Sequence, residues 1–245
     1  MRFSRSYAAV QADALWEAEG MITVYRGSEE FAWSLCCPAT AAGSSTSSSD
    51  SGTTTTVSHT SHGLPNTPNL CVYVVSGTGW TVGLVRYAYI DANTYKVYAA
   101  YNANVPTLKL VGGAPTEATF LTVPVPTEIL LPESQILIDT QWEFNAVASN
   151  KYMKVQLGGQ DVLNATTNSA SFNSLNDVRR IAGMNSLSSQ TSQANGSTGA
   201  YSLGGAIQRD TVNLASASNL TFLGGPTTTA GNWIRLLSVA VRVLQ

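Results

Sequence analysis

Residues 232–245, the closing stretch of the chain, read NWIRLLSVAVRVLQ. In an extended strand, alternate side chains point to opposite faces, so the odd positions from Trp233 to Val243 share one face and the even positions from Ile234 to Leu244 share the other. Both faces are mostly apolar. A strand with one solvated face would alternate apolar and polar residues, so this pattern predicts a strand covered on both sides, in the centre of a sandwich or at a subunit interface.

The same stretch is a poor helix candidate, because it is rich in β-branched residues and no capping box precedes it. At about 3.3 Å per residue it would extend over roughly 40 Å, which is long for a strand. We therefore expect the rest of the chain to supply its partners. The candidate interface residues are Trp233, Ile234, Leu236, Leu237, Val239, Val241 and Val243.

The second half of the chain consists of short apolar segments separated by polar turns. Residues 134–144 alternate most clearly, with one face formed by Ile136, Ile138, Thr140, Trp142 and Phe144. The sequence GGQ at 158–160 predicts a tight hairpin turn. Because no helix of useful length is expected there, the spacing predicts an all-β fold, with an antiparallel jelly roll or β-sandwich over residues 116–245.

The first half, residues 1–115, reads as a smaller β-rich region. Residues 6–19 are Ala-rich and predict a short helix. Residues 44–62 are different, because fourteen of these nineteen residues are Ser or Thr. Such a segment buries too little apolar surface to offset its ordering entropy, so we expect a long exposed loop. If it is ordered, something outside this subunit must pack against it.

Composition narrows the class of protein. Charged residues make up 11% of the chain, against an ordinary share of about a quarter, and hydrophobic residues make up 44%. This balance is common in β-rich proteins whose surfaces are largely covered by neighbours. The net charge is −2 and the densest basic pair is Arg179 and Arg180, so we expect no nucleic-acid binding.

The first 20 residues, the lack of long apolar windows and the cysteines indicate in which compartment the chain is made. Residues 1–20 lack the apolar core of a signal peptide, and no later window is apolar over about 18 residues. We therefore expect synthesis in a cytoplasm and no membrane insertion. Cys36, Cys37 and Cys71 are an odd number of cysteines, which argues against a disulfide framework, but a bridge from Cys36 or Cys37 to Cys71 stays open.

The order of segments in the second half is similar to that of a known class. An alternating strand with Trp142 is followed by the hairpin KVQLGGQDVL at 154–163, a polar middle, the segment DTVNLASASNLTF at 210–222 and the closing strand. This pattern resembles the C-terminal jelly-roll domains of tailed-bacteriophage virion proteins, such as fibre and head-decoration proteins. The resemblance covers residues 116–245 and implies a structural role on a virus particle, as a homotrimer. Residues 1–115 would then attach it to other virion proteins.

Catalytic constellations are sparse. His59 and His62 are the two histidines and both lie in the Ser/Thr-rich segment, so a nucleophilic triad is not expected. Asp139 and Glu143 share a strand face but would lie roughly 13 Å apart, too far for glycoside hydrolysis. The glycines at 77, 79 and 83 miss the dinucleotide-binding spacing and precede a strand, so they indicate a hairpin turn. No cofactor is expected.

Two groups of residues are candidates for binding. His59 and His62 could hold a metal ion if a threefold axis multiplied them, and the alternative is two solvated loop histidines. The aromatic side chains in residues 80–101 could stack on sugar rings, and the alternative is packing within the protein or between subunits. The candidate glycan-stacking residues are Trp80, Tyr87, Tyr89 and Tyr98.

These observations favour a non-enzymatic structural component of a bacteriophage virion, a trimeric fibre, tail or capsid-surface protein that contacts the host. It would be made in the host cytoplasm and reside on the virion. The alternative hypothesis is a carbohydrate-binding module that recognises a host surface glycan, and a third is a sugar hydrolase. A stable monomer in solution would count against the first hypothesis, whereas glycan binding and polysaccharide turnover test the other two.

Overall fold

The computed structural model describes residues 21–27, 33–36, 44–51, 53–76, 78–100, 108–110, 117–167, 170–171, 173–193, 207–216, 218–226 and 231–245. These residues form antiparallel β-strands and a short 3-10 turn, η2 (Thr127–Ile129). The predicted all-β fold class is therefore confirmed. The helix expected at residues 6–19 lies outside the described residues.

The larger sheet is built around the closing strand. Its strands in spatial order are β1 (Met21–Gly27), β17 (Trp233–Leu244), β10 (Gln135–Phe144), β13 (Ser174–Gly183), β14 (Gln190–Gln193) and β15 (Ile207–Asp210), and β2 (Trp33–Cys36) also pairs with β17. β10 pairs with β17 along almost its whole length, while β1 and β2 share the opposite edge of β17. The closing strand thus lies inside a sheet, as its apolar character predicts.

The second sheet completes a β-sandwich. Its order is β12 (Gln160–Thr167), β11 (Lys151–Leu157), β16 (Ser218–Pro226) and β9 (Ala118–Val125). The two sheets enclose one apolar core, in which the ring of Phe120 on β9 meets the ring of Trp142 on β10 edge to face at 5.8 Å between centroids. The alternating face predicted for residues 134–144 is the buried face of β10.

The closing strand departs from strict alternation at a single position. Gln141 of β10 pairs with Ser238, whereas the next residue, Trp142, pairs with Leu236, so Leu237 is the extra residue of a β-bulge. The bulge shifts the alternation of buried and less buried residues along β17 by one position. The buried residues are therefore Ile234, Leu236, Val239, Val241 and Val243. Their opposite face is half-buried rather than fully covered. Within the single chain, full cover is therefore found on one face of β17, and both faces look apolar in the sequence because the bulge residue Leu237 shifts the alternation.

The chain segment between β2 and β9 forms a small closed barrel. It consists of β3 (Ser44–Ser51), β4 (Thr54–Ser58), β7 (Thr94–Val97), β6 (Gly83–Asp91), β5 (Cys71–Ser76) and β8 (Leu108–Leu110). The long exposed loop expected over residues 44–62 was wrong, because β3 and β4 form a hairpin in this barrel. Thr55 and Val57 turn inward and are buried by the chain's own strands, so no outside partner is required.

The sandwich takes strands from both sides of the barrel. β1 and β2 precede the barrel, yet they pair with β17 at the end of the chain. We predicted one boundary at residue 115, but β1 and β2, which lie before it, belong to the sandwich. Such pairing between distant segments leaves no local mark in the sequence.

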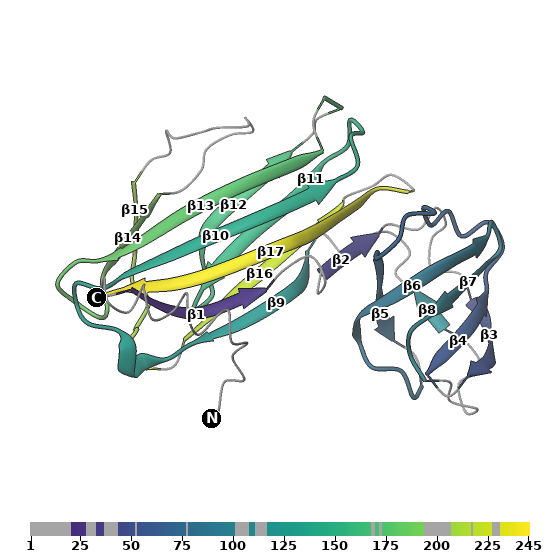
Figure 1. Ribbon diagram of the computed structural model, residues 1–245, viewed down its shortest axis with the longest axis horizontal. Helices are drawn as coiled ribbons and strands as arrows, with labels where there is room; N and C mark the ends of the chain where they lie inside the picture. Colours follow the sequence, from purple (N-terminus) through teal and green to yellow (C-terminus); the bar gives the residue numbers. More distant parts are fainter. Residues whose placement is uncertain are drawn as a thin grey trace.

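The pairing of β17 with β1 and β2 defines the two ends of the sandwich. Met21 of β1 lies opposite Leu244, and Cys36 of β2 lies opposite Trp233 at the other end of β17. The barrel follows β2, so it sits at the end of the sandwich remote from the C-terminus (Figure 1). We call the end of the sandwich that contains Met21 and Leu244 the chain-end pole.

Candidate functional site

The candidate interface residues on β17 divide into two groups. Ile234, Leu236, Val239, Val241 and Val243 lie in the core of the sandwich. A second copy of the folded chain cannot contact these side chains, so the expected interface role does not apply to them. Trp233 and Leu237 are half-buried, and Trp233 packs against the core of the barrel.

Strand β2 joins the barrel to the sandwich. The Ser34 hydroxyl donates a hydrogen bond to the backbone oxygen of Asn69, just before β5, with 3.0 Å between the oxygen atoms. The Cys36 sulfur lies 3.7 Å from the Tyr87 hydroxyl and belongs to the barrel core. β2 also pairs with β17 through its backbone. The same short strand is therefore part of the sandwich sheet and part of the packing of the barrel.

Polar contacts hold Trp233 in place at this junction. Its backbone N–H donates to Asn145 Oδ1 at 3.1 Å, and the Arg235 guanidinium lies 5.6 Å from the centre of its indole ring. Arg235 Nε in turn donates to Glu143 Oε2 at 2.6 Å. Glu143 is thus engaged in an ion pair, while Asp139 is exposed on the same strand.

The described cysteines are buried thiols. Cys36 and Cys71 are both unbridged, and Cys37 lies outside the described residues. Burial raises the pKa of the Cys71 thiol to about 11, so its reactive thiolate is scarce at neutral pH. Burial also raises the pKa of the neighbouring Tyr87 hydroxyl well above its ordinary value.

The two histidines belong to the barrel interior rather than to a solvated loop. His62 is fully buried; its Nδ1 accepts the Leu64 N–H at 3.0 Å, and its Nε2 lies 2.7 Å from the Asp91 backbone oxygen. Both ring nitrogens are engaged, so His62 has no lone pair for a metal ion. His59 is buried beside it, and burial, followed by the proximity of His62, lowers the pKa of His59.

The candidate glycan-stacking aromatic residues differ in burial. Tyr87 is a core residue whose hydroxyl donates to the Pro65 backbone oxygen at 2.6 Å, so it is unavailable to a sugar. Trp80 and Tyr89 are half-buried and pack against the barrel core. Tyr98 is 57% exposed. Of these candidates, it presents the largest open aromatic surface.

Tyr98 has a polar neighbour, Arg86, that sequence reasoning missed. The Arg86 guanidinium lies 5.8 Å from the centre of the Tyr98 ring, and Arg86 Nη2 donates to Asn69 Oδ1. The Tyr98 N–H donates to the Arg86 backbone oxygen at 2.9 Å, so the two residues are cross-strand neighbours. The alternation of β6 and β7 places them on outward faces, but their adjacency depends on a strand register that the sequence alone does not display.

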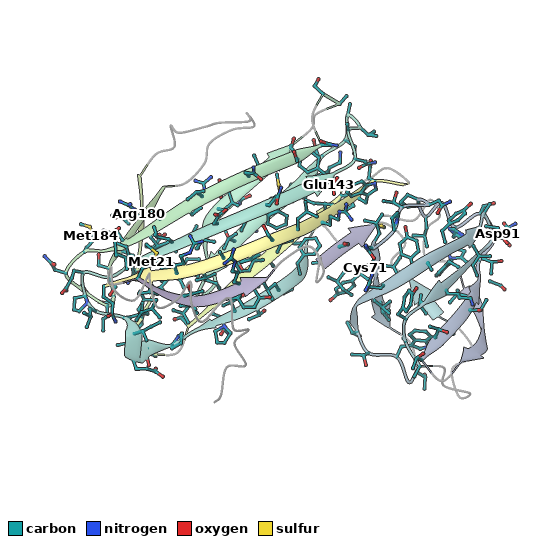
Figure 2. All side chains as sticks on the ribbon, in the orientation of Figure 1. Met21, Cys71, Asp91, Glu143, Arg180 and Met184 are labelled. Carbon is teal, nitrogen blue, oxygen red and sulfur yellow. The ribbon has the colours of Figure 1, made fainter. Side chains whose placement is uncertain are left out.

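The chain-end pole exposes apolar side chains. Leu131 is 45% exposed and Met184 is 46% exposed. The Gly183 N–H donates to the Ser134 backbone oxygen at 3.0 Å, which brings the turn before β10 and the end of β13 together. Figure 2 shows Met21 and Met184 at this pole and Asp91 at the far side of the barrel.

Within the described ranges, no group of three or more His, Cys, Asp or Glu side chains is arranged to hold a metal ion. The same ranges contain no helix with the length and apolar character needed to cross a membrane.

No known protein family and no curated protein matches the sequence. The chain is similar to a solved structure described as the CBM2 module of the evolved Dit of Lactobacillus casei BL23 phage J-1, with 14% identity and a TM-score of 0.35. The alignment covers 91% of this chain and 96% of that one. At this level the likeness establishes neither a shared fold nor a shared function.

Proposed function

We propose that the protein is a non-enzymatic structural component of a bacteriophage virion that attaches by its chain-end pole and carries the barrel at the opposite end. The observation that supports this proposal is which strands pair with the two ends of β17. Its C-terminal end lies beside Met21, and its N-terminal end lies beside β2, from which the barrel follows. Anything joined to the chain-end pole is therefore separated from the barrel by the length of the sandwich.

The surface of the chain-end pole suits attachment. Leu131 and Met184 are large apolar side chains that are 45% and 46% exposed in the single chain, and burial against a partner would remove this apolar surface from water. The Gln245 amide donates to the Ile129 backbone oxygen at 3.0 Å, which fixes the C-terminal residue onto the same surface. On this proposal, the partner is another virion protein or the symmetry mates of a homotrimer.

Incorporation into particles tests the proposal. A Leu131→Asp/Met184→Asp double variant, supplied during infection in place of the wild-type chain, is expected to fold but to be missing from purified particles. The matched control is Val147→Asp, since Val147 is 42% exposed but follows the opposite end of β10; this variant should be incorporated normally. Absence of the wild-type chain from purified particles, or normal incorporation of the double variant, would contradict the proposal.

The trimer is tested separately by light scattering after size exclusion. We expect a mass three times that of the chain. A wild-type protein that remains monomeric at micromolar concentration would contradict the trimer, but not the location on the particle.

A further inference from the structure

The outer wall of the barrel formed by β4, β7 and β6 has an unusual set of side chains. Buried and more exposed residues alternate along β4 and β7, and on β6 the buried Tyr87 identifies the inward face, so the outward positions can be assigned. Backbone pairing sets Lys96 of β7 between Thr56 of β4 and Ala88 of β6. The outward positions are Thr54, Thr56 and Ser58 on β4, Thr94, Lys96 and Tyr98 along β7 and just beyond it, and Arg86, Ala88 and Ile90 on β6.

This wall combines an open aromatic ring with positive charge. The Arg86 guanidinium lies 5.8 Å from the centre of the Tyr98 ring, close to the outer limit for a cation over an aromatic face. The ring is still 57% exposed, so its surface is not covered by the arginine. Lys96 lies two residues from Tyr98 on the same face of β7.

The arginine is held in position before any ligand arrives. Arg86 Nη2 donates to Asn69 Oδ1. Asn69 has a backbone φ of 61°, in the left-handed region that Asn tolerates better than most residues. A side chain restrained in this way loses less conformational freedom on binding than a free arginine does.

Acidic residues are few in the described parts of the three strands that form this wall. Within the described parts of β4, β6 and β7, the acidic residue is Asp91, at the end of β6. Its Oδ1 accepts the Asn93 N–H at 2.7 Å in the turn that follows. In the paired register positions of β6 and β7, no carboxylate therefore stands beside Arg86 and Tyr98.

We infer that this wall is a binding site for a polysaccharide that contains uronic acid. The apolar face of a sugar ring would stack on Tyr98, and the hydroxyl groups of Thr54, Thr56 and Thr94 would meet the sugar hydroxyls. A uronic acid carries its carboxylate directly on the sugar ring. Stacking on Tyr98 would therefore bring that carboxylate within reach of Arg86, whose planar fork matches a carboxylate. This inference goes beyond the proposed function and does not depend on it.

Titration calorimetry of the full chain with short oligogalacturonates tests the inference. We expect binding that weakens when sodium chloride rises from 50 to 500 mM, because exposed charges are screened. The fully methyl-esterified oligosaccharide keeps the sugar rings but lacks the charge, so it should bind about tenfold more weakly, which corresponds to about 1.4 kcal/mol. Poly(glycerol phosphate) lacks a stacking sugar ring in its backbone and should not compete.

Substitutions assign the binding to this wall. Tyr98→Ala should weaken oligogalacturonate binding about tenfold, whereas Tyr98→Phe should retain it. Arg86→Gln should remove the preference for the acid over the methyl ester. Arg180→Gln, an exposed cation on β13 of the sandwich, should bind like the wild type. Thermal unfolding midpoints show whether each variant is folded.

Three results would overturn the inference: no binding of oligogalacturonate at millimolar concentration, wild-type affinity in the folded Tyr98→Ala and Arg86→Gln variants, or equal competition by poly(glycerol phosphate). None of these results bears on whether the chain is part of a particle. Conversely, absence of the chain from particles would leave the binding measurements unchanged. The two proposals can therefore fail separately.

Discussion

Cys36 and Trp233 lie opposite each other across β2 and β17, and both pack against the core of the barrel. The two residues are separated by almost the whole chain. Their pairing closes the sandwich sheet at the point where the chain leaves it for the barrel. At this point the described contact between the two parts is therefore a continuation of the sheet.

The first prediction concerns this junction. Trp233→Ala removes an indole ring that packs on the barrel core and lies 5.6 Å from the Arg235 guanidinium. Because Trp233 is half-buried, we expect a loss of about 2 kcal/mol in the free energy of unfolding, below the cost of deleting a fully buried Trp. Urea unfolding should then show separate transitions for barrel and sandwich. Trp233→Phe should retain most of the stability, and an unchanged single transition in Trp233→Ala would contradict the role assigned to this residue.

The second prediction concerns the bulge at Leu237. Deleting Leu237 leaves Ile234, Leu236, Val239, Val241 and Val243 in strict alternation, so the buried set keeps its face. We expect a folded protein that is less stable by about 1 kcal/mol. Thermal unfolding measures this loss, and a deletion variant that fails to fold would show that the bulge is required.

Insertion of one alanine after Val239 is the contrasting change. It would turn Arg242 toward the core and Val241 and Val243 away from it, because a one-residue shift exchanges the faces of a strand. An unpaired buried charge costs about 3 to 5 kcal/mol, so we expect little folded protein. Equal stability of the insertion and deletion variants would contradict the assigned register.

The third prediction concerns acid stability. The pKa of His59 is lowered in the folded protein, first by burial and then by His62. The unfolded chain therefore binds a proton near the ordinary histidine pKa of about 6.5, where the folded protein does not, and stability falls as the pH drops below this value. The thermal midpoint should decrease from pH 7.5 to pH 5 more steeply in the wild type than in His59→Gln. Parallel pH profiles of the two proteins would rule out this contribution.

The fourth prediction concerns the buried thiols. With a pKa of about 11, roughly one in a thousand Cys71 side chains is a thiolate at pH 8, and burial restricts access further. In a Cys37→Ser background, native protein should react with a thiol reagent at least about a hundredfold more slowly than urea-unfolded protein. Rapid modification of the native variant would show that the junction at β2 opens readily.

Much of the sandwich could be predicted from the sequence, because its strands bury one face. Alternation marked β10 correctly, down to the buried set that ends at Phe144. The closing strand was predicted as a strand inside a sheet. Its amphipathic pattern was not recognised, because the bulge residue Leu237 interrupts the alternation. A bulge adds one residue without any change in composition, so it becomes visible only when the partner strand is known.

The barrel was harder to predict because its strands are polar. β3 and β4 are almost entirely Ser and Thr, with Val57 as the apolar residue of β4. They are strands because β7 and β8 pair with them, and such pairing depends on distant segments. The same limitation hid the candidate site: Tyr98 could be selected as an aromatic residue, but its contact with Arg86 follows from the register of β6 and β7.

The most direct test of the account is the orientation of the chain on an assembled particle. In a Cys37→Ser background, Ile90→Cys places a gold label on the barrel and Gln245→Cys places one at the chain-end pole, while the buried thiols should not react. β17 alone spans 12 residues, or about 40 Å. Electron microscopy should show the Gln245→Cys label against the particle body and the Ile90→Cys label at least about 40 Å further out. The reverse order, or labels at equal distance, would contradict the proposed attachment.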